Sequence, residues 1–195
     1  MHLLENLKKY DIKLASNSPR RRELLSGLGI DYEVQVLPGI NEDYPAGLEG
    51  EEIPVYIARE KAEAYRSLLK DNDLLITADT IVYVDGQVLG KPSDEADARR
   101  MLRLLSGKEH QVITGVCLTG KHRQRSFASV TRVTFAPLTP DEIDYYVSHY
   151  HPLDKAGAYG IQEWIGYVGV SAISGSYFNV MGLPVQRLYQ ELKEW

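Results

Sequence analysis

The sequence predicts an α/β fold in which helices flank a mixed, twisted β-sheet. Strand-like and helical segments alternate in the first half of the chain, and two strand-like segments follow each other directly in the second half. Of the 195 residues, 44% are hydrophobic and 25% are charged, as in ordinary globular proteins. This length supports one hydrophobic core and is short for two independent ones, so we expect a single domain over residues 1–195.

The first elements are expected to be a strand, a helix, a second strand and a long helix. Residues 12–15 indicate a short strand, and Pro19 suits the first position of a helix for which Ser18 is the N-cap. This helix is expected to end at two closely spaced glycines. Residues 32–37 indicate a strand, and residues 54–69 indicate a helix with an apolar stripe.

The middle of the chain is expected to hold a buried strand, a hairpin and a helix. Residues 74–78 form the largely apolar run that is typical of a buried strand. Residues 81–84 and 87–89 flank an Asp-Gly turn, which is typical of a two-residue hairpin. Ser93 is expected to cap a helix whose acidic first turn suits the helix dipole, and Gly107 is expected to end it.

The last part of the chain is expected to pair two strands directly and then return to helices. Residues 112–118 and 126–135 have strand patterns and are joined by a polar turn. Residues 139–150 begin with capping-box spacing and predict a helix. A glycine-rich stretch then surrounds an apolar strand at residues 167–173, and Pro184 opens a final helix.

Composition and charge exclude several classes of protein. The net charge of -5 argues against a protein that coats nucleic acid, because such binding needs an excess of Lys and Arg. No apolar run approaches the roughly 20 residues that span a bilayer, and the first eleven residues mix charges with leucines, unlike a signal peptide. We therefore expect a cytoplasmic protein without nucleic-acid or membrane partners. Cys117, the only cysteine, is expected to fill the core.

A basic cluster marks the start of the first predicted helix. Arg20, Arg21 and Arg22 lie where the helix dipole is already positive, so each costs about 0.3–1 kcal/mol unless an anion compensates. A phosphate there would use free N–H groups and guanidinium groups together. Ser16 and Ser18 add hydroxyl donors at the preferred ligand position of an α/β sheet. The alternative is that these arginines point into solvent and an acidic neighbour offsets one of them.

Three further charged residues are candidates for a phosphate or metal site. Asp79 follows a buried strand, so its carboxylate is a metal ligand, a general base or a member of a structural ion pair. Lys61 shares the inward stripe of its helix with Tyr65 and Leu68, and it either binds phosphate or extends to the rim of the core. Lys91, which follows the hairpin, offers a second such cation.

Several short motifs, in their order and spacing, resemble the Maf family of nucleotide pyrophosphatases. The similarity runs from Leu14 nearly to the C-terminus. The motifs that carry it are LASNSPRR at 14–21, EKA at 60–62, ADTIV at 78–82, GKP at 90–92, DKAGAYGIQ at 154–162, GSY at 175–177 and NVMGLP at 179–184. The motif at 154–162 is similar to that of the family branch that acts on dTTP and UTP, and Gln162 is its most distinctive residue.

The resemblance implies a fold like that of inosine triphosphatases, with two lobes, an elongated shape and the site in a central cleft, and it implies a homodimer. The implied reaction converts dTTP, UTP, and also CTP or modified pyrimidine nucleotides, to the monophosphate and pyrophosphate, a house-cleaning activity. Asp79 is implied as the catalytic acidic residue, with Arg20, Thr80 and Gln162 as specificity determinants. Mg²⁺ or Mn²⁺ is the implied cofactor, for which Asp79 and Glu42 would suffice as carboxylate ligands.

In the expected reaction, a water activated by Asp79 or the metal attacks the α phosphorus and pyrophosphate leaves. The residues expected to bind or select the substrate are Ser16, Ser18, Arg20, Arg21, Lys61, Thr80, Lys91 and Gln162. One rival hypothesis is a nucleotide-binding regulator of septum formation with little turnover. Another is a phosphomonoesterase, which would release orthophosphate.

Overall fold

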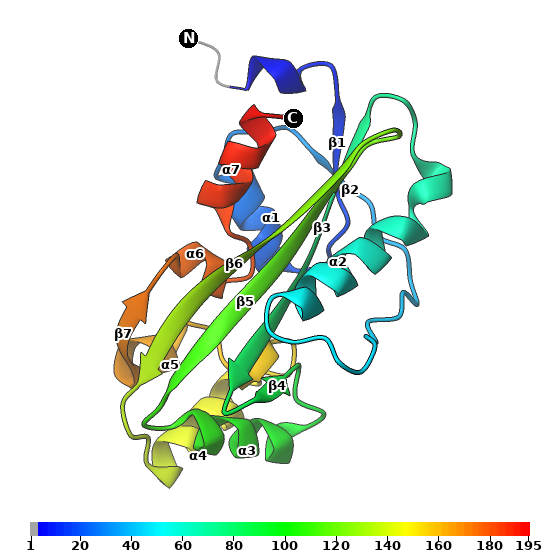
Figure 1. The fold of residues 1–195 in the computed structure, drawn as a ribbon. Helices are drawn as coiled ribbons and strands as arrows, with labels where there is room; N and C mark the ends of the chain where they lie inside the picture. The colour runs from blue at the N-terminus through cyan, green and yellow to red at the C-terminus, as the bar shows by residue number, and fades with distance from the viewer. Residues whose placement is uncertain (1–3) are drawn as a thin grey trace. The chain divides into compact units, whose positions relative to one another are not determined.

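The structure, a computed structural model that describes residues 4–195, confirms the predicted α/β fold. Seven strands form a mixed sheet in the order β2-β1-β3-β5-β6-β7, with β4 paired to β3 (Figure 1). The strands are β1 (Asp11–Leu14), β2 (Glu33–Val34), β3 (Asp73–Val84), β4 (Gln87–Leu89), β5 (Glu109–Thr119), β6 (Gln124–Phe135) and β7 (Val170–Ser174).

Helices flank this sheet, as the sequence predicts. The α-helices are α1 (Pro19–Ser26), α2 (Glu52–Ala64), α3 (Glu95–Leu105), α4 (Pro140–Tyr150), α5 (Trp164–Gly169), α6 (Tyr177–Val180) and α7 (Val185–Lys193). Short 3-10 helices occur at Glu5–Leu7, Arg66–Leu68 and Ala156–Ala158. Every helix within residues 4–195 is too short or too polar to traverse a lipid bilayer. Residues 1–3, which begin the segment expected to differ from a signal peptide, lie outside the described residues.

The contacts between Cα atoms group the chain into two compact units. The first comprises Met1–Asp79, Thr114–Ser129 and Gly182–Trp195, and the second comprises Thr80–Ile113 and Val130–Met181. Strands β3, β5 and β6 each contribute residues to both units. The single domain over residues 1–195 stays a prediction.

In the first unit, β1 lies between β2 and β3 and is parallel to both. Strand β5 approaches α2 so closely that a Cβ on Gly115 would lie 2.3 Å from the carbonyl carbon of Pro54. The hydroxyl of Thr77 in β3 donates a 2.6 Å hydrogen bond to the carbonyl oxygen of Ala58 in α2. These contacts fix α2 on the sheet. Cys117 is fully buried in the core of this unit, which confirms its predicted role.

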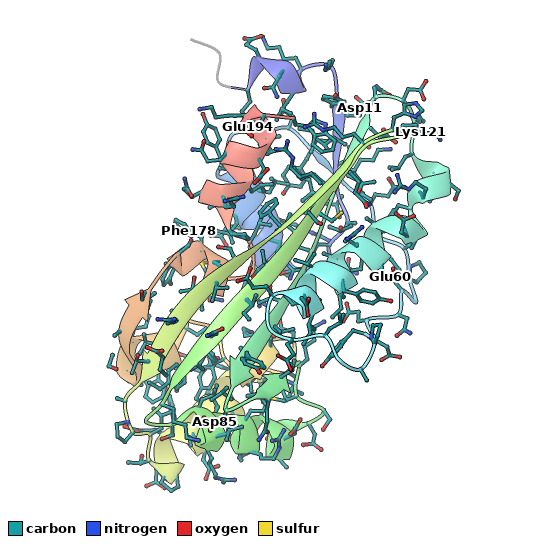
Figure 2. The ribbon with its side chains drawn as sticks, viewed as in Figure 1. Asp11, Glu60, Asp85, Lys121, Phe178 and Glu194 are labelled. Atoms are coloured by element: carbon teal, nitrogen blue, oxygen red, sulfur yellow. The ribbon has the colours of Figure 1, made fainter. Side chains whose placement is uncertain are left out.

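In the second unit, β3 and β4 form the predicted hairpin. Val84 pairs with Gln87, and the turn residues Asp85 and Gly86 have φ angles of 49° and 74°. Two positive φ angles are what a type I′ turn requires, and Figure 2 labels Asp85 at this turn. Helices α3 and α4 pack against each other in this unit.

The structure corrects two predicted helix and strand boundaries. Ser93 does not cap α3, because the side chain of Asp94 accepts the hydrogen bond from Asp97 N at 2.8 Å. The segment at 167–173 is not one strand, since its first three residues end α5 and only the rest belongs to β7. A Cβ on Gly166 would lie 1.7 Å from the carbonyl oxygen of Ile161, so the start of α5 packs directly on the preceding loop.

Three other predictions about elements are confirmed only in part. Strand β2 covers two of the residues predicted at 32–37. Helix α2 ends at Ala64 and a 3-10 turn follows it, so that Tyr65 is buried as expected but Leu68 is 48% exposed. The strands predicted at 74–78 and 81–84 are one continuous strand that runs through Asp79.

Candidate active site

The loop between β1 and α1 is stabilised by hydrogen bonds to its own serine side chains. Ser18 is the N-cap predicted from the sequence, and its hydroxyl accepts a 3.4 Å hydrogen bond from Arg21 N. The hydroxyl of Ser16, which is buried, accepts from Ser18 N at 3.2 Å. These bonds satisfy two backbone N–H groups at the start of a helix, where unpaired donors otherwise remain. The loop is therefore held in one conformation by side chains that were expected to contact phosphate.

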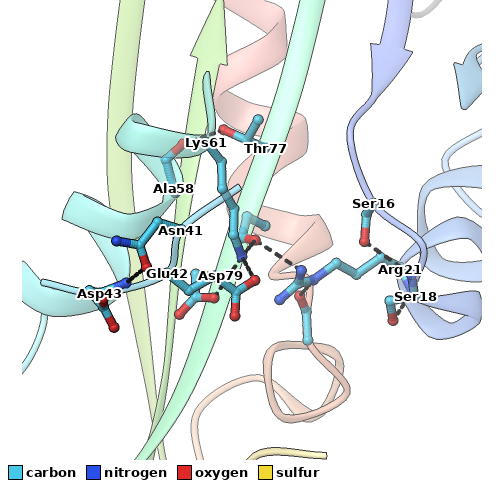
Figure 3. A network of polar contacts seen from close by, with 12 residues as sticks. Ser16, Ser18, Arg21, Asn41, Glu42, Asp43, Ala58, Lys61, Thr77 and Asp79 are labelled. Atoms are coloured by element: carbon cyan, nitrogen blue, oxygen red, sulfur yellow. Dashed lines mark hydrogen bonds and ion pairs between the residues drawn. The ribbon is translucent and has the colours of Figure 1, made fainter. Parts of the chain in front are cut away.

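Arg21 points inward from α1 and binds the backbone. Its Nε donates to the carbonyl oxygen of Gly182 at 2.8 Å, and its Nη1 donates to that of Ala78 at 2.9 Å (Figure 3). Burial lowers the pKa of the Arg21 guanidinium, while the negative charges of Asp79 and Glu42 raise it. Arg21 therefore fixes the backbone immediately before Asp79.

The other two arginines of the cluster differ from Arg21. Arg22 donates from Nε to the carbonyl oxygen of Ser16 at 3.3 Å, and from Nη2 to Asn17 Oδ1 at 3.3 Å. Arg20 is half-buried, and its positive charge helps to lower the pKa of Arg21. The three consecutive arginines therefore have separate surroundings.

Lys61, Asp79 and Glu42 form the central charge cluster of the first unit (Figure 3). Lys61 Nζ lies 2.9 Å from Asp79 Oδ1 and 2.8 Å from Glu42 Oε1. The side chains of Lys61 and Asp79 are each 13% exposed, whereas that of Glu42 is 50% exposed. Lys61 thus faces inward, as the stripe on its helix predicts, and two carboxylates converge on one ammonium group.

Each member of this cluster is placed by a local structural feature. Asp79 lies in β3, and Lys61 lies on α2, one turn after the residue that Thr77 anchors to β3. Glu42 lies in an irregular loop, in which Asn41 Oδ1 accepts a 3.0 Å hydrogen bond from the following backbone N–H of Asp43. This turn is of the kind that Asn side chains stabilise.

The donor set fits a divalent metal ion. Mg²⁺ prefers oxygen ligands and is usually bound by one or two carboxylates together with water and substrate phosphates. Oxygens of Asp79 and Glu42 both lie within 2.9 Å of Lys61 Nζ, so the two carboxylates are close enough to each other to share one cation. Within residues 4–195, no group of three or more His, Cys, Asp or Glu side chains is placed around one potential metal position.

The remaining predicted site residues, Thr80, Lys91 and Gln162, belong to the second unit. Thr80 is half-buried and Lys91 is exposed. The motif that contains Lys91 is linked to the motif that contains Gln162, because Gly157 N donates to the carbonyl oxygen of Gly90 at 3.0 Å. A Cβ on Gly157 would lie 2.7 Å from a methyl carbon of Val82, so the Gln162 motif also packs on β3.

The sequence alone did not identify Tyr146 and Glu163 as partners in the second unit. The hydroxyl of Tyr146, on α4, donates a hydrogen bond to Glu163 Oε2 and accepts one from Gly160 N at 3.0 Å. Lys155 Nζ lies 3.2 Å from Glu163 Oε1. The only sequence feature that could have pointed to Glu163 is its position directly after Gln162. The hydrogen bond of Tyr146 to Glu163 depends on tertiary packing and has no signal in the sequence.

Comparisons with known proteins agree on one family. The family model described as "Maf-like protein" matches residues 11–195. A relative from Phocaeicola vulgatus, named "dTTP/UTP pyrophosphatase", is 69% identical over 98% of this chain and 100% of its own length. A protein of the same name from Porphyromonas gingivalis is 59% identical over 99% of this chain and 98% of its own.

A solved structure supports the fold alone. The structure of a HAM1 protein from Coxiella burnetii is 18% identical, with a TM-score of 0.51 over 95% of this chain and 100% of that one.

Proposed function

The chain belongs to the Maf family, and on that premise we propose that it hydrolyses dTTP and UTP to the monophosphate and pyrophosphate. Relatives that share 69% and 59% identity with almost the whole chain carry the name of this activity. The structural observation that carries the proposal is the convergence of Asp79 and Glu42 on Lys61. Carboxylates and a lysine at one position are the groups that metal-assisted phosphoryl chemistry needs.

In the proposed reaction, Asp79 acts as the general base. It accepts a proton from a water whose oxygen attacks the α phosphorus, and the bond to the bridging oxygen breaks so that pyrophosphate leaves with the electron pair. Mg²⁺ or Mn²⁺, held by Asp79 and Glu42, would supply positive charge to the phosphate oxygens when bound. Lys61 neutralises the negative charge that grows on the departing group.

The other predicted residues bind or select the substrate in this proposal. Arg20 and Lys91 bind the triphosphate, and Ser16 and Ser18 shape the loop that receives it. Thr80 and Gln162 contact the pyrimidine base. We assign Arg21 a positioning role, because its guanidinium binds the carbonyl oxygens of Ala78 and Gly182 and so fixes the backbone at Asp79.

A product assay on a nucleotide panel tests this function. Purified protein is incubated with dTTP, UTP, CTP or GTP and Mg²⁺, and both pyrophosphate and orthophosphate are measured. We expect pyrophosphate, released fastest from dTTP and UTP. Release of orthophosphate alone would identify a phosphomonoesterase. Nucleotide binding without any product would identify a regulator, an alternative that the relatives' names do not favour.

Four broader expectations complete the proposal. Modified pyrimidine nucleotides are additional substrates, consistent with a house-cleaning role, and CTP is a weaker one. The protein acts in the cytoplasm as a homodimer. Cell fractionation and light scattering of the purified protein test these last two statements.

A further inference from the structure

Glu163 is held from two sides in the second unit. On one side, the hydroxyl of Tyr146 donates to Oε2 and at the same time accepts a 3.0 Å hydrogen bond from Gly160 N. On the other side, Lys155 Nζ lies 3.2 Å from Oε1, and it also donates to Asp154 Oδ1 at 2.7 Å. The Glu163 carboxylate therefore has a fixed orientation, because each oxygen has its own partner.

These partners are themselves buried. Tyr146 is fully buried, and its ring stacks on that of Tyr150 with centroids 5.1 Å apart. Lys155 is 8% exposed. Burial and the neighbouring Glu163 raise the pKa of Tyr146, so its hydroxyl keeps its proton and remains a donor.

Gln162 belongs to the same cluster. A Cβ built on Gly160 would lie 3.0 Å from Lys155 Cε, 3.1 Å from Gln162 Nε2 and 3.1 Å from Glu163 Cδ. Three side-chain ends thus meet over one glycine, and a methyl group there would require them to shift by a few tenths of an ångström. The amide of Gln162 is packed beside the carboxylate and the ammonium group and has little freedom to turn.

The oxygen of this amide is oriented but unsatisfied. Gln162 Oε1 is buried and has no hydrogen-bond partner among the described residues. A buried acceptor without a donor is destabilising, so a ligand that donates a hydrogen bond to it is favoured. Uracil and thymine present an N–H donor beside a carbonyl acceptor, whereas cytosine presents a ring nitrogen acceptor beside an amino donor. An amide of fixed direction can therefore match uracil and thymine but not cytosine in the same pose.

We propose that Tyr146, Glu163 and Lys155 are positioning residues that fix the direction of the Gln162 amide and so select uracil and thymine over cytosine. This inference rests on the proposed function, in which Gln162 contacts the base. The three residues act through Gln162 and do not contact the substrate. Their contribution is the orientation of the amide, which would otherwise turn over and accept either class of pyrimidine.

The variant Tyr146→Phe tests this role. It keeps the buried ring and removes the hydroxyl that joins Glu163 to Gly160. We expect the ratio of kcat/KM for UTP over CTP to fall by about tenfold, the equivalent of one hydrogen bond to a charged group. Gly160→Ala, whose added methyl displaces the three side-chain ends without removing a polar group, should lower the same ratio.

The matched control is Tyr65→Phe in the first unit. Tyr65 is 1% exposed, and its hydroxyl likewise accepts from a backbone N–H, that of Leu37 at 2.8 Å, and donates to a backbone carbonyl, that of Gln35 at 3.2 Å. Tyr65→Phe should lower the melting temperature about as much as Tyr146→Phe does, but it should keep the preference for UTP over CTP.

A second pair of variants tests Glu163. Glu163→Gln can still accept a hydrogen bond from Tyr146, so it should retain more of the preference for UTP than Glu163→Ala.

The same ratio is measured from the equilibrium affinities for UTP and CTP, so that the test does not depend on turnover. If the wild-type protein binds these nucleotides but releases no pyrophosphate, the proposed function fails while the affinity ratio still tests the positioning role. A folded Tyr146→Phe protein whose UTP-to-CTP ratio equals that of the wild type overturns the inference. A uniform loss toward both nucleotides overturns it as well.

Discussion

Asp79 shares the ammonium group of Lys61 with Glu42, and this arrangement allows its charge to be removed with little change in packing. We expect Asp79→Asn to lower kcat by about 10²–10⁴-fold, the usual contribution of a general base, because the amide cannot accept the proton of the attacking water. The measurement is pyrophosphate release from UTP under saturating conditions, together with the melting temperature.

The same strand provides a matched control for this substitution. Asp73, also in β3, is buried and pairs with Lys13 at 2.7 Å, but it is not a candidate site residue. Asp73→Asn should lower the melting temperature and leave kcat nearly unchanged. Equal losses of kcat in the two variants would show that Asp79 serves the fold and not the reaction.

At the scale of single elements, the contact between β5 and α2 depends on one glycine. A Cβ at position 115 would meet the backbone of α2 at 2.3–2.4 Å, and backbone atoms at the start of a helix cannot move aside as a flexible side chain can. We expect Gly115→Ala to lower the free energy of unfolding by about 3 kcal/mol, measured in urea. Gly120→Ala, whose Cβ would meet Trp195 at an ordinary 3.4 Å, is the control and should cost much less.

Elements with strong local signals were predictable, and those that depend on tertiary contacts were not. The capping box predicted at the start of α4 is confirmed, because Thr139 and Glu142 each form a hydrogen bond to the other's backbone. At α3, Ser93 and Asp94 are both good N-cap residues, and sequence alone does not choose between them. The apolar run at 167–173 fits a helix and a strand equally well until its packing is known.

The candidate site follows the same division. Lys61 was identified by helical spacing and Asp79 by its charge in an apolar run, and both face inward. The contact of Glu42 with Lys61 comes from an irregular loop whose path no periodicity describes. The hydrogen bonds of Arg21 to the backbone and of the Tyr146 hydroxyl to Glu163 are not predictable from the sequence either, since each joins residues that are separated in the chain.

For the whole molecule, the buried His110 links stability to pH. Its Nε2 lies 2.7 Å from the hydroxyl of Tyr159, and desolvation lowers its pKa from 6.5 to about 4. The unfolded chain therefore binds a proton below pH 6.5 that the folded chain takes up only near pH 4. The stability present above pH 6.5 should fall, by up to about 3 kcal/mol, as the pH drops through this window.

The variant His110→Gln checks this linkage, since it keeps an acceptor near Tyr159 and removes the titrating ring. Urea unfolding at pH 7 and pH 4.5 should show a smaller loss of stability in the variant than in the wild type. An identical loss in both proteins would assign the acid sensitivity to other groups. One of these groups is Asp73. Burial raises the pKa of its carboxyl group, but the hydrogen bonds from Lys13 and from the backbone N–H of Lys70 lower that pKa by more, so Asp73 titrates below its ordinary range.

The burial of Cys117 makes the protein convenient for spectroscopy. It is the only thiol of the chain, it is closed off by α2, and burial raises its pKa, so maleimide reagents have neither access to it nor much thiolate to attack. A cysteine introduced at an exposed position outside the candidate site, such as Asp71, would then carry a fluorophore or spin label alone, with no need to remove the native one.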